Sequence, residues 1–415
     1  MYIKELTNEE FRNFSSKYNQ KSIYQTVEYA HVMNKQKFDS MYVGLMDDNH
    51  IVAASLLLIE KIRRFKYAYA PKGFLIDYLD HNLVSTFTIE LKKFLGKKGV
   101  VAVKLNPMII KNTYDFKYNV FKKDAYFDSS FEFLQKEGYY HYGFNEFFEA
   151  LKPRYEAIID ISVPYYMVFK NFDKKLRTKI RSAEGRGIHI YKGDYDDLKY
   201  LYLQTKFKYP RDLKYYEDCY TEFSKTKSIE FFYAKLDTKH YLKLCQDKYT
   251  KQESICLNMN EQLMEQTNKK EKLIEKKMAA DKLLDTYKRE LIKATKMLKN
   301  NEFGIILASA MIIKNSDTVY LYMDGYDSKY KNFNAKHLLL WKLCERYSKA
   351  GYKYFNLGGV AGINASKSDY EGLKNFKCSF NAKVIEYLGD LELITNNTLY
   401  FMYRNTKPIQ NILKK

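Results

Sequence analysis

Residues 270–301 read KEKLIEKKMAADKLLDTYKRELIKATKMLKNN, and no glycine or proline occurs anywhere from residue 239 to residue 301. Apolar residues recur along the quoted stretch at spacings of three, four or seven: Leu273, Ala280, Leu284, Tyr287, Leu291, Ala294 and Leu298. This spacing brings them to one side of an α-helix and is typical of a coiled-coil seam. Lys277 occupies the one seam position that is not apolar.

The residues before this stretch repeat the pattern at Cys245, Tyr249, Cys256, Met259 and Leu263, and the polar run Thr267-Asn268-Lys269-Lys270 separates the two halves. We therefore predict two antiparallel helices of about 28 residues each, an arm about 40 Å long at the helical rise of 1.5 Å per residue. The alternative is one long helix that pairs with a second chain, identical or different. The hairpin is favoured because it keeps the flanking strands close in space.

Alternating strands and helices are predicted on both sides of the arm. The strands expected before it are 38–45, 51–59, 67–76, 100–105, 157–161, 188–191 and 229–235, with a helix at 83–96, a basic helix after 161 and helices as far as 225. After it we expect a hairpin of strands 305–313 and 318–324, a helix at 335–350 and a strand at 354–357. This order predicts a mixed-sheet α/β fold with the arm inserted between two strands of one domain.

The composition narrows the class of protein further. The chain has 415 residues, is 46% hydrophobic and carries a net charge of +20. It is apolar enough to form cores, and its length suggests roughly two to three domains. It has no apolar run long enough for a transmembrane helix and no secretion signal at its start, which predicts a cytoplasmic protein. Its five cysteines lack a Cys-x-x-Cys pair, which argues against a zinc site or disulfide framework.

The positive charge is concentrated in two places. The segment 170–192 holds eight lysines or arginines against Asp173 and Glu184, and the arm carries a similar surplus. Phosphate groups are the natural partner of such a surface. We predict contacts with tRNA for Arg177, Lys179, Arg181 and Arg186. A solvated helix face, and an arm that serves for dimerisation or docking, remain alternatives, and so does peripheral contact with the anionic inner face of the membrane.

Several phrases, taken in order, resemble the FemABX family of peptidoglycan-branching aminoacyltransferases. They are YAYAPKGF at 67–74, RDLKYY at 211–216, LGGV at 357–360, LKNFKCSF at 373–380 and EYLGD at 386–390. The inserted arm is similar to that of the FemA and MurM branches. The resemblance implies two GNAT-like domains, 1–153 plus 385–415 and 154–238 plus 302–384, with the arm at 239–301.

The resemblance also implies an activity. An amino acid would pass from aminoacyl-tRNA to the stem-peptide amine of lipid II or UDP-MurNAc-pentapeptide, without metal or cofactor. Neither half has closely spaced glycines that would bind the pyrophosphate of coenzyme A; Asn332–Lys336 (NFNAK) takes that place in the second half. Two alternatives are the same donor with another amine acceptor, and a non-enzymatic basic adaptor that binds RNA or membrane.

Site residues follow from the same resemblance. For the acceptor, Arg211 is expected to bind the diphosphate, Tyr215 to line its pocket, and Lys35 or Lys37 to replace a family lysine whose place is taken by Met33. Phe376 and Lys377 are expected to face the donor as catalytic residues. Tyr320 and Tyr322 share one strand face and are expected to line the channel, with core packing as the alternative.

Asn106 is the remaining expected catalytic position. It follows the strand 100–105, where the family has an aspartate that has been considered the general base. An amide does not accept a proton, so we expect deprotonation of the acceptor amine to be helped by the substrates or by a more distant carboxylate.

Overall fold

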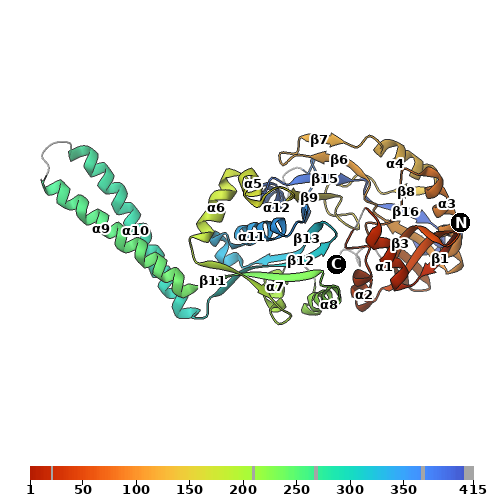
Figure 1. The fold of residues 1–415 in the computed structure, drawn as a ribbon, viewed down its shortest axis with the longest axis horizontal. Coiled ribbons are helices and arrows are strands. Elements are labelled where there is room, and N and C mark those ends of the chain that lie inside the picture. The colour runs from red at the N-terminus through yellow and green to blue at the C-terminus, as the bar shows by residue number, and fades with distance from the viewer. Residues whose placement is uncertain (20–21, 208–210, 266–269, 366–369, 406–415) are drawn as a thin grey trace.

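The computed structural model describes residues 1–19, 22–207, 211–265, 270–365 and 370–405, and consists of two lobes and a projecting arm (Figure 1). The first lobe is built on a seven-stranded sheet. In spatial order its strands are β1 (Tyr2–Leu6), β2 (Asp39–Asp47), β3 (His50–Ile62), β4 (Phe65–Ala70), β5 (Val100–Leu105), β16 (Leu391–Ile394) and β8 (Tyr139–His141). Helices α3 (His81–Lys97) and α4 (Phe127–Lys136) pack on one face, and α1 (Asn8–Lys17) and α2 (Val27–Lys35) on the other.

The second lobe is built on a nine-stranded sheet. Its strands in spatial order are β10 (Ile188–Gly193), β11 (Ile229–Leu236), β12 (Ile305–Asn315), β13 (Thr318–Tyr326), β14 (Tyr354–Gly359), β9 (Tyr155–Asp160), β15 (Lys383–Tyr387), β6 (Ile110–Tyr114) and β7 (Val120–Lys123). One face is covered by α5 (Tyr165–Asn171), α6 (Lys174–Glu184), α11 (Ala335–Lys349) and α12 (Glu371–Cys378). The other face carries α7 (Leu198–Thr205) and α8 (Leu213–Ser224) and turns toward the first lobe (Figure 1).

The two lobes repeat one plan. In each, four antiparallel strands (β1–β4 and β10–β13) are followed by a long helix (α3 or α11) and a fifth strand parallel to the fourth (β5 or β14). One apolar cluster joins them, because side chains of α2 and β2 pack together with those of α8, β11 and β12. The predicted mixed α/β class with an inserted antiparallel arm is confirmed.

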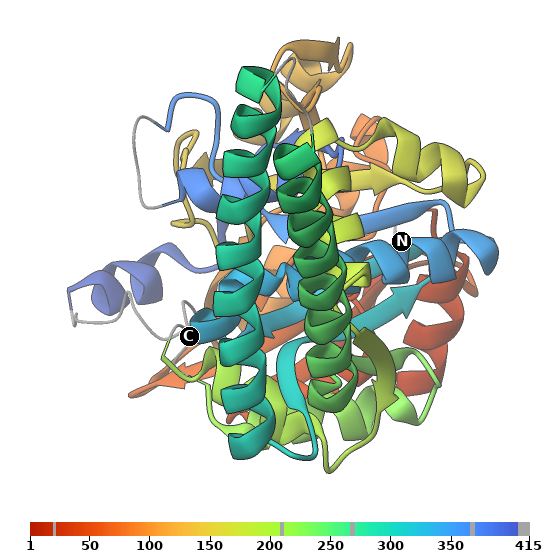
Figure 2. The same ribbon diagram turned by 90° about the vertical axis from the view of Figure 1, so that its left-hand side faces the viewer.

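The arm is a hairpin of α9 (Thr238–Glu265) and α10 (Lys270–Asn300), which lie side by side in two views (Figures 1 and 2). The prediction of two antiparallel helices is confirmed, and the single-long-helix alternative is wrong. The arm leaves the sheet between β11 and β12, whose ends pair at Leu236 and Ile305. In the first lobe the corresponding link between β2 and β3 is a tight turn at Asp48 and Asn49.

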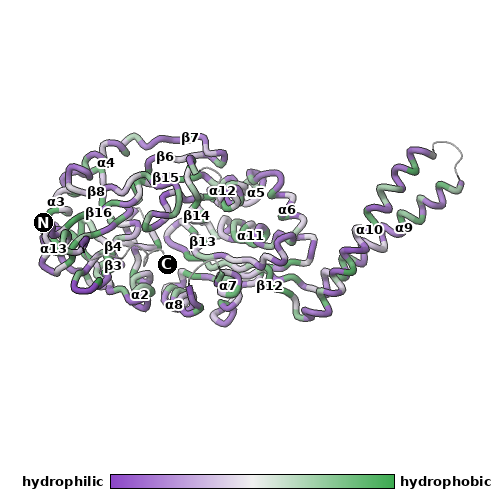
Figure 3. The backbone as a smooth tube through the Cα atoms, turned by 180° about the vertical axis from the view of Figure 1, so that it is seen from behind, coloured by the Kyte–Doolittle hydropathy of each residue, from purple (hydrophilic) through white to green (hydrophobic). Residues whose placement is uncertain are grey.

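The seam predicted for the arm is the interface between its helices. Each apolar seam residue of α10 is buried or half-buried, and hydrophilic and hydrophobic segments alternate along the arm (Figure 3). The polar seam residue Lys277 is an ion-pair partner of Asp281 at 2.5 Å. The position that interrupts the pattern in α9 is Gln252, whose amide donates across the seam to the Ala280 carbonyl at 3.1 Å. The midpoint residues 267–269 lie outside the described ranges.

Three differences from the predicted strands and domain limits affect how the two sheets are built. The strand expected at 67–76 ends at Ala70, because Pro71-Lys72-Gly73 forms a turn with Lys72 at a φ of 52°. Strands β6 and β7, which sequence patterns did not predict, extend the second sheet although their residues fall in the predicted first domain. The predicted limit at residue 385 falls inside β15, which pairs with β9 and β6 in the second sheet, while β16 pairs with β5 and β8 in the first.

None of the helices in the described ranges combines the length and the apolar character that a membrane crossing requires. The five cysteines are all buried, and none of them forms a disulfide.

Candidate functional site

The central feature of the second lobe is an opening between β13 and β14. These parallel strands pair only over Thr318–Tyr320 and Tyr354–Asn356, and both continue beyond that pairing, to Tyr326 and Gly359. The Lys377 side chain reaches this opening from α12, and its ammonium donates to the Gly359 carbonyl at 2.8 Å. Gly358, at a φ of 77°, supplies a backbone conformation that favours glycine beside that ammonium. The opening therefore holds one of the predicted catalytic residues.

Lys377 is held in an unusual electrostatic state. Burial lowers the pKa of its ammonium to about 8, and the neighbouring Lys336 acts in the same direction while Asp324 opposes it. Lys336 itself forms an ion pair with Asp324. A lysine with such a pKa exists in both protonation states near neutral pH, which suits a group that stabilises a developing negative charge.

Phe376 lies on the α11 side of the same opening. Its ring packs edge-on against His337 at 5.1 Å and against Phe380 at 5.5 Å, and the Lys336 ammonium lies 4.5 Å from its centre. Burial lowers the pKa of His337 to about 4, helped by the charges of Lys179 and Lys336. His337 is therefore neutral at physiological pH, and a predicted tRNA contact, Lys179, lies close enough to influence it.

The four predicted tRNA contacts are on or just after α6, which packs against α11. Arg181 lies over Phe169 at 5.7 Å, and Arg186 lies over Phe333 at 5.3 Å and donates to the Asn332 carbonyl at 2.6 Å. The Nε of Arg177 is buried and has no hydrogen-bond partner within the described part of the chain. The arm begins beside this region, because Tyr241 of α9 packs against Phe333 at 5.3 Å. The basic helix α6, the root of the arm and Phe376 thus all lie on one side of the second sheet.

The predicted acceptor residues come together on the opposite side of that sheet. The Arg211 guanidinium lies 4.5 Å from the centre of the Tyr215 ring, and the hydroxyls of Tyr215 and Tyr322 are 2.5 Å apart. Local sequence explains the placement: Asp212 caps α8 by accepting from the backbone N–H of Tyr215, which directs the first turn of the helix toward β13. Arg211, Tyr215 and Tyr322 therefore form one cluster.

Tyr320 lies two residues before Tyr322 on β13 and lines a groove of about 430 Å³. The groove is also lined by Met108, Ile158, Asp160, Asn356 and Tyr387. Tyr320 and Asn356 are the last paired residues of β13 and β14, so the groove borders the point where the two strands part.

Asn106 is buried where the segments after β4, after β5 and before β9 meet. Its side-chain oxygen accepts from the backbone N–H of Lys72 at 2.9 Å, and its amide nitrogen donates to the Lys152 carbonyl at 3.2 Å. Both ends of the amide are engaged, so Asn106 positions the two lysines. A direct part in the chemistry stays a prediction.

Lys35 is engaged elsewhere. Its ammonium forms ion pairs with Glu222 at 2.7 Å and Asp218 at 3.5 Å, because it leaves the last turn of α2 where α2 packs against α8. Its hydrogen bond to Glu222 raises the pKa of Lys35. The structure places it among carboxylates of α8 and does not bring it into contact with Arg211.

Three residues near this site escaped the sequence analysis: Lys72, Lys152 and Glu156. The buried Glu156 carboxylate accepts from Asn356 at 2.8 Å and forms an ion pair with Lys72 at 3.0 Å. Lys72 also lies over the Tyr387 ring at 3.9 Å. The turn Pro71-Lys72-Gly73 was a visible signal for Lys72, but nothing distinguishes Lys152 from the other lysines of a lysine-rich chain.

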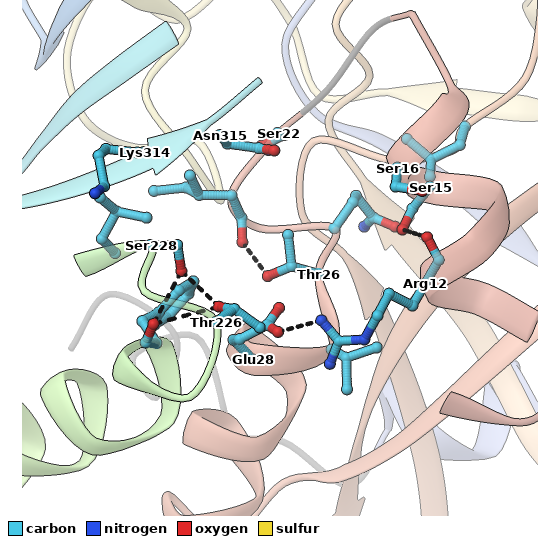
Figure 4. A pocket seen from close by; sticks show the side chains of 16 residues that line it. Arg12, Ser15, Ser16, Ser22, Thr26, Glu28, Thr226, Ser228, Lys314 and Asn315 are labelled. Atoms are coloured by element: carbon cyan, nitrogen blue, oxygen red, sulfur yellow. Dashed lines mark hydrogen bonds and ion pairs between the residues drawn. The ribbon is translucent and has the colours of Figure 1, made fainter. Parts of the chain in front are cut away.

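A second cavity, of about 160 Å³, lies between α1, α2, α8 and β12 (Figure 4). It is lined by small hydroxyl side chains and by Arg12, which forms an ion pair with Glu28. It contains none of the predicted site residues. Within the described ranges, no cluster of three or more His, Cys, Asp or Glu side chains could hold a metal ion.

Comparison with known proteins shows the family and the fold of this chain. The sequence model of the FemAB family matches residues 6–407. Aminoacyltransferase FemB of Staphylococcus epidermidis (strain ATCC 12228) is 26% identical over 438 residues, covering 100% of both chains. Aminoacyltransferase FemA of Staphylococcus epidermidis (strain ATCC 35984) is 23% identical over 426 residues, covering 99% of this chain and 100% of its own.

Among solved structures, FemX superposes with a TM-score of 0.74 at 19% identity, over 97% of this chain and 99% of that one, and so shares its fold. The predicted family resemblance is confirmed, and the activity predicted from it, aminoacyl transfer, is the one named for both relatives. The chain belongs to the FemAB family.

Proposed function

We propose that this protein transfers an amino acid from aminoacyl-tRNA to the stem-peptide amine of a peptidoglycan precursor, lipid II or UDP-MurNAc-pentapeptide, and so builds the interpeptide bridge. The observation that carries the proposal is the opening between β13 and β14. Phe376, Lys179 and the basic helix lie on one side of the sheet, and the Arg211 cluster and the groove of Tyr320 lie on the other.

The chemistry follows from this division. The donor ester would enter from the α6 and α11 side, with its terminal adenosine against Phe376 and its carbonyl beside Lys377. The acceptor amine would arrive along the groove and attack the carbonyl carbon. The C–N bond forms, the bond to the ribose oxygen of the tRNA breaks, and that oxygen leaves with a proton. Protonated Lys377 stabilises the negative charge on the carbonyl oxygen.

The proton of the attacking amine needs an acceptor. Asn106 cannot supply one, and Glu156 is bound by Lys72 and Asn356. The ribose hydroxyl next to the ester, or the leaving oxygen itself, is the acceptor that this arrangement favours. Positioning of the two substrates then provides the main part of the rate enhancement.

One assay tests the proposal. Purified protein is incubated with aminoacyl-tRNAs carrying labelled amino acids and with either lipid II or UDP-MurNAc-pentapeptide. Label should move to at least one precursor, and transfer should fail with Lys377→Met. Binding of tRNA without transfer to any amine would instead identify a non-enzymatic adaptor, and transfer only to other amines would identify a different acceptor.

Two finer features of the proposal concern location and assembly. We propose a cytoplasmic protein whose β6–β7 hairpin contacts the anionic inner face of the membrane, because Val120 and Phe121 are exposed beside Lys122, Lys123 and Lys383. Sedimentation with anionic vesicles, compared with zwitterionic ones, tests this contact.

We further propose that the protein pairs with a second chain through its arm. Three large apolar side chains are exposed there: Leu257, Met264 and Met278. Sedimentation equilibrium of the wild type and of a triple Leu257→Gln, Met264→Gln, Met278→Gln variant tests it. A monomeric wild type at micromolar concentration would contradict it.

A further inference from the structure

Strand β13 changes faces near its middle because it contains a β-bulge. Its register against β12 shifts between the pairs Leu321–Ile312 and Met323–Met311, which leaves Tyr322 as the extra residue. Leu321 packs in the apolar cluster on the α11 side of the sheet, whereas Met323, two residues later, packs in the cluster on the α8 side. Simple alternation would put both on one face. The bulge therefore exchanges the two faces for the last residues of β13.

This exchange turns Asp324 toward the side on which the donor is proposed to bind. Asp324 pairs in register with Ala310, which belongs to the cluster on the α11 side. Its carboxylate forms an ion pair with Lys336, in the first turn of α11. Without the bulge, Asp324 would share a face with Tyr320 and Tyr322, which pack on the α8 side. Bulges beside functional sites commonly re-aim a side chain in this way.

Contacts connect Asp324 with the proposed catalytic residues. The ammonium of Lys336, which contacts Asp324, lies 4.5 Å from the centre of the Phe376 ring. The next residue, Lys377, reaches between β13 and β14: a Cβ placed on Gly358 would lie 3.7 Å from its ammonium and 4.0 Å from a carbonyl oxygen of β13. Burial lowers the pKa of Lys377, and the charge of Asp324 is the largest effect that opposes burial. These charged groups thus border one opening.

The Asp324 carboxylate can bind a second cation. Its side chain is 20% exposed, so a ligand can reach it. The oxygen that meets Lys336, Oδ2, has no hydrogen bond in the described part of the chain, and a carboxylate can accept at both oxygens. The other carboxylate that acts on Lys377 is Glu156, which is already paired with Lys72. Of the two, Asp324 is the carboxylate available to a ligand.

An aminoacyl donor brings a cation to this place. It carries an α-amino group on the carbon next to its carbonyl, and such a group is mostly protonated at neutral pH, because its pKa is about 7.7–8.0. With the carbonyl beside Lys377, this ammonium group would arrive next to Lys377 and Lys336 and be repelled by both. A carboxylate at the same place offsets that repulsion and accepts the hydrogen bonds of the ammonium group.

We propose that Asp324 binds the α-ammonium group of the amino acid on the donor tRNA and thereby selects donors with a free α-amino group. This role rests on the proposed function, which makes aminoacyl-tRNA the donor and brings its carbonyl to Lys377. It goes beyond that function because it assigns a residue to the amino acid itself.

The test compares two donors that share one tRNA. One carries a labelled amino acid, taken in turn from those of the transfer assay. The other carries the corresponding α-hydroxy acid, made by deamination with nitrous acid, which replaces the ammonium by a hydroxyl group of nearly the same size. Filter binding to the full-length protein measures both affinities without an acceptor. The wild type should bind the aminoacyl form about tenfold or more tightly, as expected for one charged hydrogen bond.

Three variants separate binding from a structural role. Asp324→Asn should weaken only the aminoacyl form and bring the two affinities within about twofold; the ratio cancels the change in net charge, because both donors share the tRNA. Lys336→Met removes the ion-pair partner but leaves the carboxylate, so it should keep at least the wild-type ratio. The matched control Glu345→Gln removes an ion-paired carboxylate from the last turns of the same helix and should also keep that ratio.

Three outcomes would overturn the proposal: a ratio near one in the wild type, an unchanged ratio in Asp324→Asn, or an equal loss of the ratio in Lys336→Met and Asp324→Asn, which would make the pair structural only. A ratio that depends on Asp324, without transfer to any amine, would instead reject the proposed function and leave the binding site standing. Transfer by a wild type that binds both donors equally would reject only the role of Asp324.

Discussion

At the scale of single residues, Asn106 occupies the place of the family's aspartate and has a structural role there. Its amide joins two backbone segments that carry Lys72 and Lys152, accepting from one and donating to the other. A carboxylate accepts at both oxygens and donates at neither. Asn106 lacks the basicity of an aspartate, but it can bind the backbone of both lysines, which an aspartate cannot.

This role makes the variant Asn106→Asp informative. The new carboxylate would face the Lys152 carbonyl without a donor, so we expect a loss of about 1–3 kcal/mol of unfolding free energy and a lower transfer rate. Denaturant unfolding and single-turnover transfer measure the two effects. A faster transfer rate in Asn106→Asp would show that a base at this position is useful and would contradict the positioning role.

Lys377 gives a second prediction at this scale. Its pKa is lowered in the folded protein, so the charged form opposes folding below about pH 8, and stability rises as the pH increases from about 8 toward the unfolded value. Lys377→Met should therefore raise the unfolding free energy at neutral pH by about 1–3 kcal/mol, less the hydrogen bond to Gly359.

The same substitution should lower kcat strongly and leave the KM of the acceptor nearly unchanged, because the role proposed for the ammonium is stabilisation of the transition state. In the wild type, single-turnover transfer should decline above about pH 8 as Lys377 loses its proton. Thermal unfolding and transfer kinetics on the same preparation check both parts. A Lys377→Met variant that is less stable and equally active would contradict them.

At the scale of elements, the arm has two parts with different roles. Tyr241, Cys245 and Ala294 at its root are buried in the core of the second lobe, and Tyr241 donates to Glu290 at 3.1 Å. Beyond them the helices contact mainly each other along the seam. The arm is therefore anchored in the core, and its outer part projects from it (Figure 1).

Two deletions test this division. Replacing residues 249–287 by a short Gly-Ser linker should leave the melting temperature of the body within a few degrees and weaken tRNA binding. Replacing residues 242–297 should remove Cys245 and Ala294 from the core and lower the melting temperature clearly. Calorimetry and filter binding measure the two properties. Equal melting temperatures for both deletions would show that the root is not part of the core.

At the scale of the whole molecule, part of the excess positive charge is concentrated on one side of the second sheet. The basic helix α6 and the arm root lie together, on the side of the second sheet opposite the Arg211 cluster. A polyanionic donor and a diphosphate acceptor would then approach from different sides and meet at the opening between β13 and β14. The apolar cluster shared by α2 and α8 joins the two lobes.

The salt dependence of tRNA binding tests whether tRNA contacts the basic helix α6. Each cation that contacts a phosphate adds about 0.7–0.9 to the slope of log affinity against log salt. The double variant Lys179→Gln, Arg181→Gln should lower that slope by about 1.5. The matched control Lys97→Gln, Lys136→Gln removes the same charge from exposed positions of α3 and α4 and should leave the slope unchanged. Equal slopes for both variants would mean that net charge alone attracts tRNA.

The sequence by itself determined the features that repeat locally. The heptad spacing of Leu273 to Leu298 and the absence of glycine and proline specified the arm, since a helical seam depends only on residues three, four and seven apart. Alternation along β13 likewise brought Tyr320 and Tyr322 to one face, and the ordered phrases identified the family. These patterns involve neighbours along the chain, so they can be read without coordinates.

Only the tertiary structure decided what lies beside what across long separations. It brought Lys152 to Tyr29, turned Lys35 toward Glu222, and placed β6 and β7 on the second sheet. In a lysine-rich sequence, no local pattern distinguishes Lys152 from Lys35. What separates them is what surrounds each ammonium: Lys35 pairs with the carboxylates of Glu222 and Asp218, whereas Lys152 lies against the Tyr24 ring and donates to the Tyr29 hydroxyl.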